Sequence, residues 1–171
     1  MKTKKLPKAI RPEEFKLLIK AVPKNNNKTK IAYLLAYGSG MRISEVLRCE
    51  PKHFREHSIF IPESKNGVER VVPVPKGWKK EFLRYLPIPS LSISSGSRKL
   101  QMGFKRHIRK AKLNPEYTFH SLRHGFATRM IESGVPLNQV QVLLGHSNIS
   151  TTSVYVRANP LDAIKSYEDL F

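Results

Sequence analysis

Hydrophobic residues recur at intervals of three and four positions along most of the chain, which is the period of an amphipathic helix. Phe119, Leu122, Phe126 and Met130 show this period most clearly. Glycine and proline mark the points where such segments stop. We expect helices within 11–22, 29–41, 42–49, 76–86, 98–113, 119–133 and 136–145.

The segment SIFIPESKNGVERVVPV, at 58–74, has a different pattern. Two runs rich in β-branched residues flank Asn66-Gly67, and this pair is the strongest short-range signal for a β-hairpin. The serine-rich segment 87–97 is expected to be a loop, and STTSVYVR (150–157) would be a strand on propensity alone. The chain therefore predicts an α+β fold, mainly helical, with a small antiparallel β-hairpin.

The charge balance points to a polyanionic partner. Among 171 residues, 31 are Lys or Arg and 13 are Asp or Glu, which gives a net charge of +18. Nucleic acid is the first candidate, and an anionic membrane surface is the weaker one because no long basic amphipathic helix is present. Basic side chains cluster in the helix expected over 98–113. We assign DNA contacts to Lys105, Arg106, Arg109 and Lys110, and to Arg70 of the hairpin.

Other features indicate the compartment. Cys49 is the single cysteine, so no internal disulfide can form and a reducing compartment is expected. The basic N-terminus lacks the apolar region of a secretory signal, and no segment is long and apolar enough to span a membrane. We expect a soluble, DNA-associated protein of the cytoplasm.

Two histidine-rich segments raise the question of a metal site. HSLRH (120–124) has Ser121 where a zinc-protease motif needs glutamate. HFREH (53–57) matches an inverted zinc motif, but no long helix is expected to hold it. We therefore expect neither a metal nor another cofactor.

The same residues fit phosphate chemistry better. Arg42 opens a helix, where the partial positive charge of the terminus also attracts anions, and Glu45 lies one turn on and can orient it. Arginines neutralise phosphate oxygens, imidazoles transfer protons and a tyrosine can form a covalent intermediate. The candidates are Arg42, Lys65, His120, Arg123, His146 and Tyr155, with Glu45 and His124 in supporting roles.

Four segments resemble, in order and spacing, the motifs of the tyrosine recombinase (phage integrase) family: GMRISEVL, SKNGVERVVPV, HSLRHGFATRMIESG and LLGHSNISTTSVYVR. The resemblance implies an integrase-type catalytic domain that cuts and rejoins duplex DNA without metal or ATP. It implies that Arg42, Arg123 and His146 bind the phosphate, that His120 is the base or the orienter for the tyrosine proton, that Lys65 is the acid and that Tyr155 is the nucleophile. It also implies a short helix at 150–157 and a tetrameric synapse on DNA. It is compatible with a monomeric protein in the absence of DNA.

The resemblance divides the chain into a basic arm (1–10), a catalytic domain (11–158) and a tail helix (159–171). The tail docks either on a neighbouring protomer or on its own core. Because the family usually has a DNA-binding domain before the catalytic one, we expect a fragment or a full-length partner. Two alternatives stay open. A type IB topoisomerase-like swivelase would relax plasmids without site preference, and a non-catalytic DNA-binding module would form no covalent adduct.

Overall fold

The computed structural model describes residues 8–62, 69–89, 92–145, 164–165 and 167–169. Helix α1 (Pro12–Ala21) is followed by α2 (Asn27–Ser39) and α3 (Ile43–Arg48). A short 3-10 helix η1 (Pro51–His53) leads into the strands β1 (Ser58–Ile61) and β2 (Arg70–Pro73). A second 3-10 helix η2 (Lys80–Tyr85) precedes α4 (Ile93–Lys110), α5 (His120–Glu132) and α6 (Leu137–Leu144). The predicted fold class, mainly helical with a small antiparallel sheet, is confirmed.

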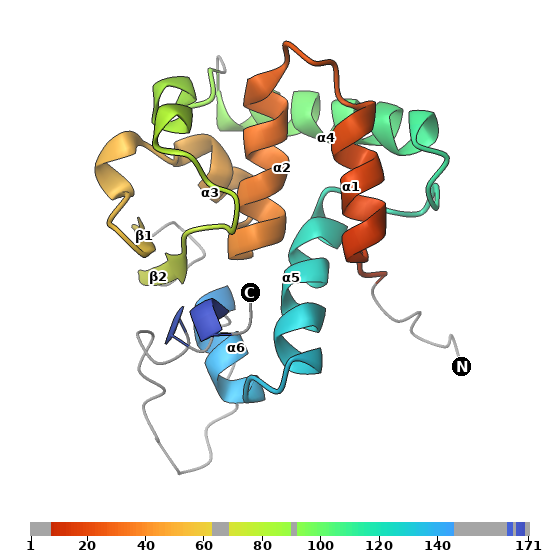
Figure 1. The fold of residues 1–171 in the computed structure, drawn as a ribbon. Helices are drawn as coiled ribbons and strands as arrows, with labels where there is room; N and C mark the ends of the chain where they lie inside the picture. Colours follow the sequence, from red (N-terminus) through yellow and green to blue (C-terminus); the bar gives the residue numbers. More distant parts are fainter. Residues whose placement is uncertain (1–7, 63–68, 90–91, 146–163, 166, 170–171) are drawn as a thin grey trace.

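The two strands pair antiparallel, with Ser58 opposite Pro73 and Ile61 opposite Arg70. The hairpin predicted around Asn66-Gly67 therefore has the expected strands, and its turn lies outside the described residues. In Figure 1 the strands lie at one side of α3, and α4 passes behind α1 and α2. Helix α5 packs along α2 and continues toward α6.

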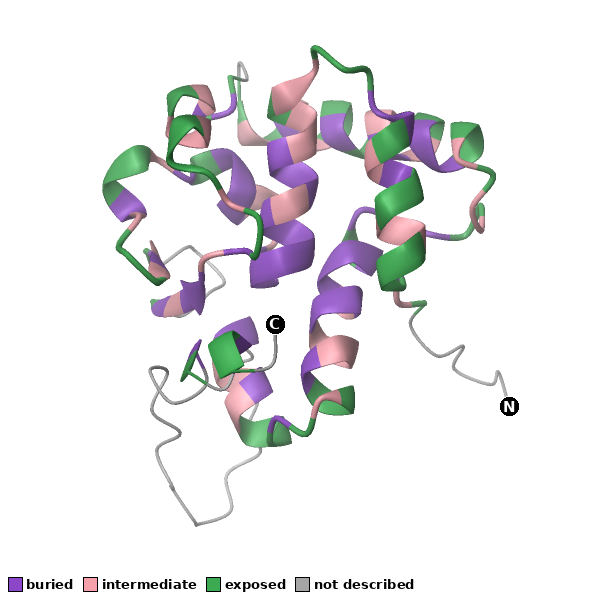
Figure 2. Ribbon diagram, viewed as in Figure 1, coloured by how far each residue is buried: buried purple, intermediate pink, exposed green. Residues whose placement is uncertain are grey.

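The hydrophobic core has two parts. The larger part surrounds α2, whose residues are buried along most of its length (Figure 2). The smaller part joins the end of α5 to α6, and includes Phe126, Met130 and Leu143. Leu122, Phe126 and Met130 are all buried, as their spacing predicts. Leu137 is 59% exposed because it begins α6 at the surface, whereas Leu143 is buried.

Two expected elements differ in the structure. The segment at 76–86 forms a 3-10 helix over Lys80–Tyr85 rather than an α-helix, and Pro87 prevents this helix from continuing. The expected loop at 87–97 was wrong at its end, because α4 already begins at Ile93. The Ser92 hydroxyl accepts a hydrogen bond from the Ser95 N–H at 3.1 Å and caps that helix.

The described tail residues pack on the chain's own core. Ile164 and Tyr167 are each 4% exposed, and the Tyr167 hydroxyl accepts a hydrogen bond from the Lys76 N–H at 3.2 Å. At the other end, Ile10 is buried and its N–H donates to the Ser121 carbonyl, so the last residue of the expected basic arm packs against α5. None of the described helices has the length and apolar character needed to cross a membrane.

Candidate active site

The turn between α2 and α3 positions the first candidate arginine. Gly40 ends α2 in the left-handed conformation (φ 69°), and Arg42 is the N-cap residue of α3. The Glu45 carboxylate accepts hydrogen bonds from the Arg42 N–H at 2.7 Å and from its Nη1 at 3.0 Å. The structure thus contains the Arg42–Glu45 contact that the one-turn spacing predicts.

Arg123 lies between the C-terminal ends of two helices. Its Nη1 donates to the Gly40 carbonyl at 2.7 Å, and its Nη2 donates to the Leu144 carbonyl. Helix C-termini carry partial negative charge, which stabilises a cation there. Burial, together with the charges of Arg42 and Arg70, lowers the pKa of Arg123. Arg123 is only 3% exposed.

The two histidines of HSLRH lie side by side at the start of α5. His120 is exposed and His124 is half-buried, and their ring centroids are 4.5 Å apart with the rings nearly perpendicular. Burial, followed by the charge of Arg123, lowers the pKa of His124. A lowered pKa favours the neutral form of the His124 imidazole near pH 7.

A second arginine contacts Glu45, and sequence reasoning did not find this contact. Arg70 donates from Nη1 and Nη2 to the two Glu45 oxygens at 2.8 and 2.9 Å. Burial disfavours the ionised carboxyl, but the hydrogen bonds and charges of Arg70 and Arg42 outweigh it and lower the pKa of Glu45. Arg70 was assigned to the DNA surface, whereas the structure places its guanidinium inside the protein. The alternation of the strand was the available signal, because Arg70 shares a face with buried Val72.

The end of α6 is the point where the three arginines meet. The carbonyls of Leu143, Leu144 and Gly145 accept hydrogen bonds from Arg70, Arg123 and Arg42 respectively. Three successive carbonyls at one helix end therefore each contact a different guanidinium. The candidates Lys65, His146 and Tyr155 lie outside the described residues.

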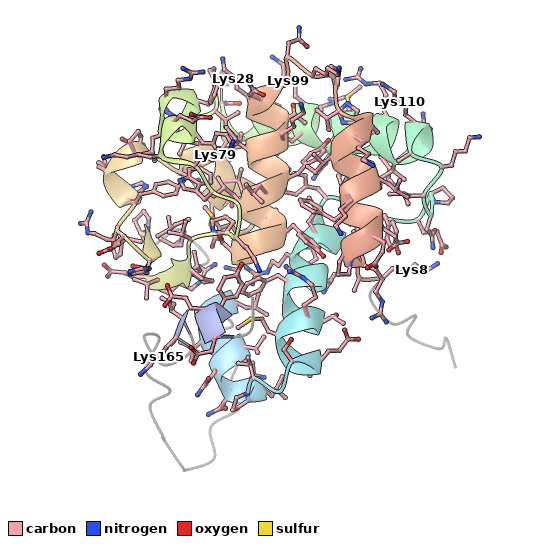
Figure 3. The ribbon with its side chains drawn as sticks, in the orientation of Figure 1. Lys8, Lys28, Lys79, Lys99, Lys110 and Lys165 are labelled. Atoms are coloured by element: carbon pink, nitrogen blue, oxygen red, sulfur yellow. The ribbon has the colours of Figure 1, made fainter. Side chains whose placement is uncertain are left out.

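A cleft of about 780 Å³ opens beside Arg42 and His120. Lys105 and Arg109 of α4 line it, together with apolar side chains such as Met102. The structure thus brings two of the four predicted α4 cations next to the candidate site. Arg106 and Lys110 occupy other exposed positions on the same helix, and Lys110 is labelled in Figure 3.

The second histidine-rich segment has other partners. His53 Nδ1 accepts a hydrogen bond from the Glu50 N–H at 3.1 Å, and His57 pairs with Glu168. Within the part of the chain that the structure describes, no group of three or more His, Cys, Asp or Glu side chains is arranged to hold a metal ion.

The conformation of Gly40 gives a testable expectation for the site's scaffold. A Cβ added there would lie 2.6 Å from Phe126 Cδ1, on a backbone with φ +69°. We expect Gly40→Ala to lower the free energy of unfolding by about 2–5 kcal/mol, because left-handed strain and overpacking add. Gly77→Ala is the matched control, since Gly77 also has positive φ but no atom within 4 Å of the added Cβ. Urea unfolding of both variants measures the difference, and equal losses would contradict the packing argument.

Comparisons with known proteins identify the family of this chain. The phage integrase family model matches residues 8–161, so the chain belongs to the phage integrase family, as its four motifs predict. The tyrosine recombinase XerA of Pyrococcus furiosus is 36% identical over 169 residues, covering 90% of this chain and 58% of that protein.

Solved structures share the fold. The integrase of mycobacterium phage Brujita superposes with a TM-score of 0.77 at 22% identity, over 100% of this chain and 60% of that one. A lambda integrase tetramer bound to a Holliday junction gives 0.60 at 17% identity, over 90% and 51%. The chain therefore spans less than two thirds of the length of each of these relatives.

Proposed function

We propose that this chain is the catalytic domain of a site-specific DNA recombinase that cuts and rejoins strands through a 3′-phosphotyrosyl intermediate at Tyr155. The observation that carries the proposal is the convergence of Arg42 and Arg123 on the end of α6, beside a cleft that His120 lines. Two guanidinium groups that converge at one place can stabilise the negative charge that grows on a phosphate in the transition state. Membership of the phage integrase family supports the same conclusion.

In the proposed reaction, the Tyr155 oxygen attacks the scissile phosphorus and the bond to the 5′ oxygen breaks. Arg42 and Arg123 neutralise the non-bridging oxygens, and His146 donates a further hydrogen bond. His120 takes the tyrosine proton and Lys65 gives a proton to the leaving 5′ oxygen. Attack by a 5′-hydroxyl from another strand reverses these steps and releases the tyrosine, so the bond energy is kept throughout.

The proposed substrate is duplex DNA, held in a tetrameric synapse in the cytoplasm. The lambda integrase tetramer on a Holliday junction supports the assembly. Incubation with nicked suicide substrates tests the activity, because loss of the short 5′ fragment traps the covalent intermediate. A denaturant-resistant protein–DNA adduct is the expected result.

The α4 cations are proposed to contact the DNA backbone next to the cleaved phosphate. Lys105 and Arg109 line the same cleft as Arg42, although Lys105 also donates to the Pro115 carbonyl at 2.7 Å. We expect Lys105→Gln and Arg109→Gln each to weaken DNA binding at all sequences and to reduce the slope of log K against log[salt] by about 1.

Lys28→Gln is the matched control for the α4 variants. Lys28 is exposed at the N-terminal end of α2 (Figure 3), and this 13-residue helix separates it from Arg42 by about 20 Å. Fluorescence anisotropy titrations at several salt concentrations measure the slopes. Equal slopes for the wild type and both α4 variants would remove these side chains from the DNA contact.

A further inference from the structure

Arg70 carries a buried charge that the proposed chemistry does not use. Its side chain is 3% exposed, and it belongs to β2 rather than to any of the helices that line the cleft. A buried guanidinium is costly unless several hydrogen bonds compensate it. Arg70 has this compensation, because Nη1 and Nη2 bind Glu45 and Nε binds the Leu143 carbonyl at 2.6 Å.

The Glu45 carboxylate is shared between Arg70 and Arg42. Each of its oxygens accepts one hydrogen bond from Arg70 and one from Arg42. Of these four hydrogen bonds to the Glu45 carboxylate, Arg70 donates two and Arg42 donates two. Without Arg70, the buried carboxylate would have Arg42 as its remaining arginine partner and would draw that guanidinium toward itself, away from the cleft.

Arg70 also contacts the backbone that leads to residue 146. Gly145 ends α6 with φ +62°, and a Cβ there would lie 2.9 Å from Arg70 Cδ. The close approach and the bond to Leu143 attach this helix end to β2. Arg70 therefore joins β2, the start of α3 and the end of α6.

We propose that Arg70 is a positioning residue for DNA cleavage, which orients Arg42 through Glu45 and holds the end of α6 in register with both. The assignment rests on the proposed recombinase function. Arg70 does not touch the phosphate itself. Its loss is expected to slow the chemical step while leaving DNA affinity nearly unchanged.

The test compares Arg70→Lys and Arg70→Met with the wild type. Single-turnover adduct formation on suicide substrates, at saturating protein, gives the rate, and anisotropy gives the DNA affinity. We expect a loss of at least about 10-fold in rate for both variants, because lysine keeps the charge but not the two-pronged geometry. Affinity should stay within about 3-fold, since mainly transition-state interactions are lost. Arg55→Met should react at the wild-type rate, because Arg55 is exposed and its guanidinium donates to the nearby Lys52 and Phe54 carbonyls.

A double-mutant cycle with Glu45→Gln separates positioning from general destabilisation. If Arg70 acts through Glu45, the double variant Glu45→Gln/Arg70→Lys reacts about as fast as the slower single variant, whereas independent effects would multiply. The acid limb of the rate profile should also move to higher pH in Arg70→Lys, because the Glu45 pKa rises toward its ordinary value. If Arg70→Met does not fold, Arg70→Lys decides the question.

A failure of the Arg70 assignment can be distinguished from a failure of the proposed recombinase function. A wild-type rate and pH profile in Arg70→Lys would overturn the assignment alone, as would multiplicative effects in the cycle. A wild-type chain that forms no adduct would overturn the proposed function and, with it, this assignment.

Discussion

Replacing Arg123 with alanine is expected to slow covalent adduct formation by about 10³-fold, the usual scale for losing a donor that stabilises transition-state charge. The guanidinium lies beside His120 and His124 in a groove between α5 and α6, and two of its five N–H donors are used by the Gly40 and Leu144 carbonyls. The substitution removes the remaining donors from the proposed phosphate site. Single-turnover kinetics on suicide substrates measure the effect.

Arg129→Ala is the matched control on the same helix. Arg129 also donates to backbone carbonyls, those of Gly125 and Tyr37, and its guanidinium stacks on the Tyr37 ring. Both alanine variants should lose stability, because each removes guanidinium donors from backbone carbonyls, at about 1–3 kcal/mol where a buried group is left unsatisfied. Only Arg123→Ala should greatly lower the rate of covalent adduct formation. Rates within 10-fold of each other would remove Arg123 from the reaction.

Tyr155→Phe is expected to abolish the adduct while DNA affinity stays within about 2-fold, because one hydroxyl adds little to a binding energy dominated by phosphate contacts. Gel analysis after denaturation measures the adduct, and anisotropy measures binding. An equal loss of binding would count against a purely chemical role for this residue.

Tyr85→Phe provides the control for a rival nucleophile. Tyr85 is a described tyrosine near the surface, and hydrogen bonds from Arg84 and Asn27 lower the pKa of its hydroxyl. A lowered pKa makes a phenol more reactive as a nucleophile. Tyr85 lies on η2, however, and the described residues that line the cleft do not include it. Its variant should form the adduct at the wild-type rate. An adduct lost in Tyr85→Phe and kept in Tyr155→Phe would reverse the assignment.

The sequence predicted the helices well where one apolar face repeats over several turns, as in α5. It predicted the strands from the Asn-Gly pair between β-branched runs. It failed at the start of α4, where serines and Gly96 suggest a loop and the helix depends on the Ser92 cap. Local composition does not show whether such a segment packs against the rest of the protein.

In the candidate site, too, contacts within one element could be predicted from the sequence and contacts between distant elements could not. The one-turn spacing predicted the contact between Arg42 and Glu45, because both belong to one helix end. The burial of Arg123 and the position of Arg70 depend on carbonyls at the ends of α2 and α6, far away in the chain. A motif gives residue types and spacing, whereas these contacts need the tertiary arrangement.

The proposed reaction depends above all on a covalent bond between Tyr155 and a 3′ phosphate of the DNA. The most direct measurement incubates the wild-type protein with nicked suicide duplexes of several sequences, in EDTA, and then digests any denaturant-resistant adduct for peptide mapping by mass spectrometry. We expect an adduct whose modified peptide contains Tyr155 linked to a 3′ phosphate. A modified peptide without Tyr155, or a 5′ linkage, would contradict it.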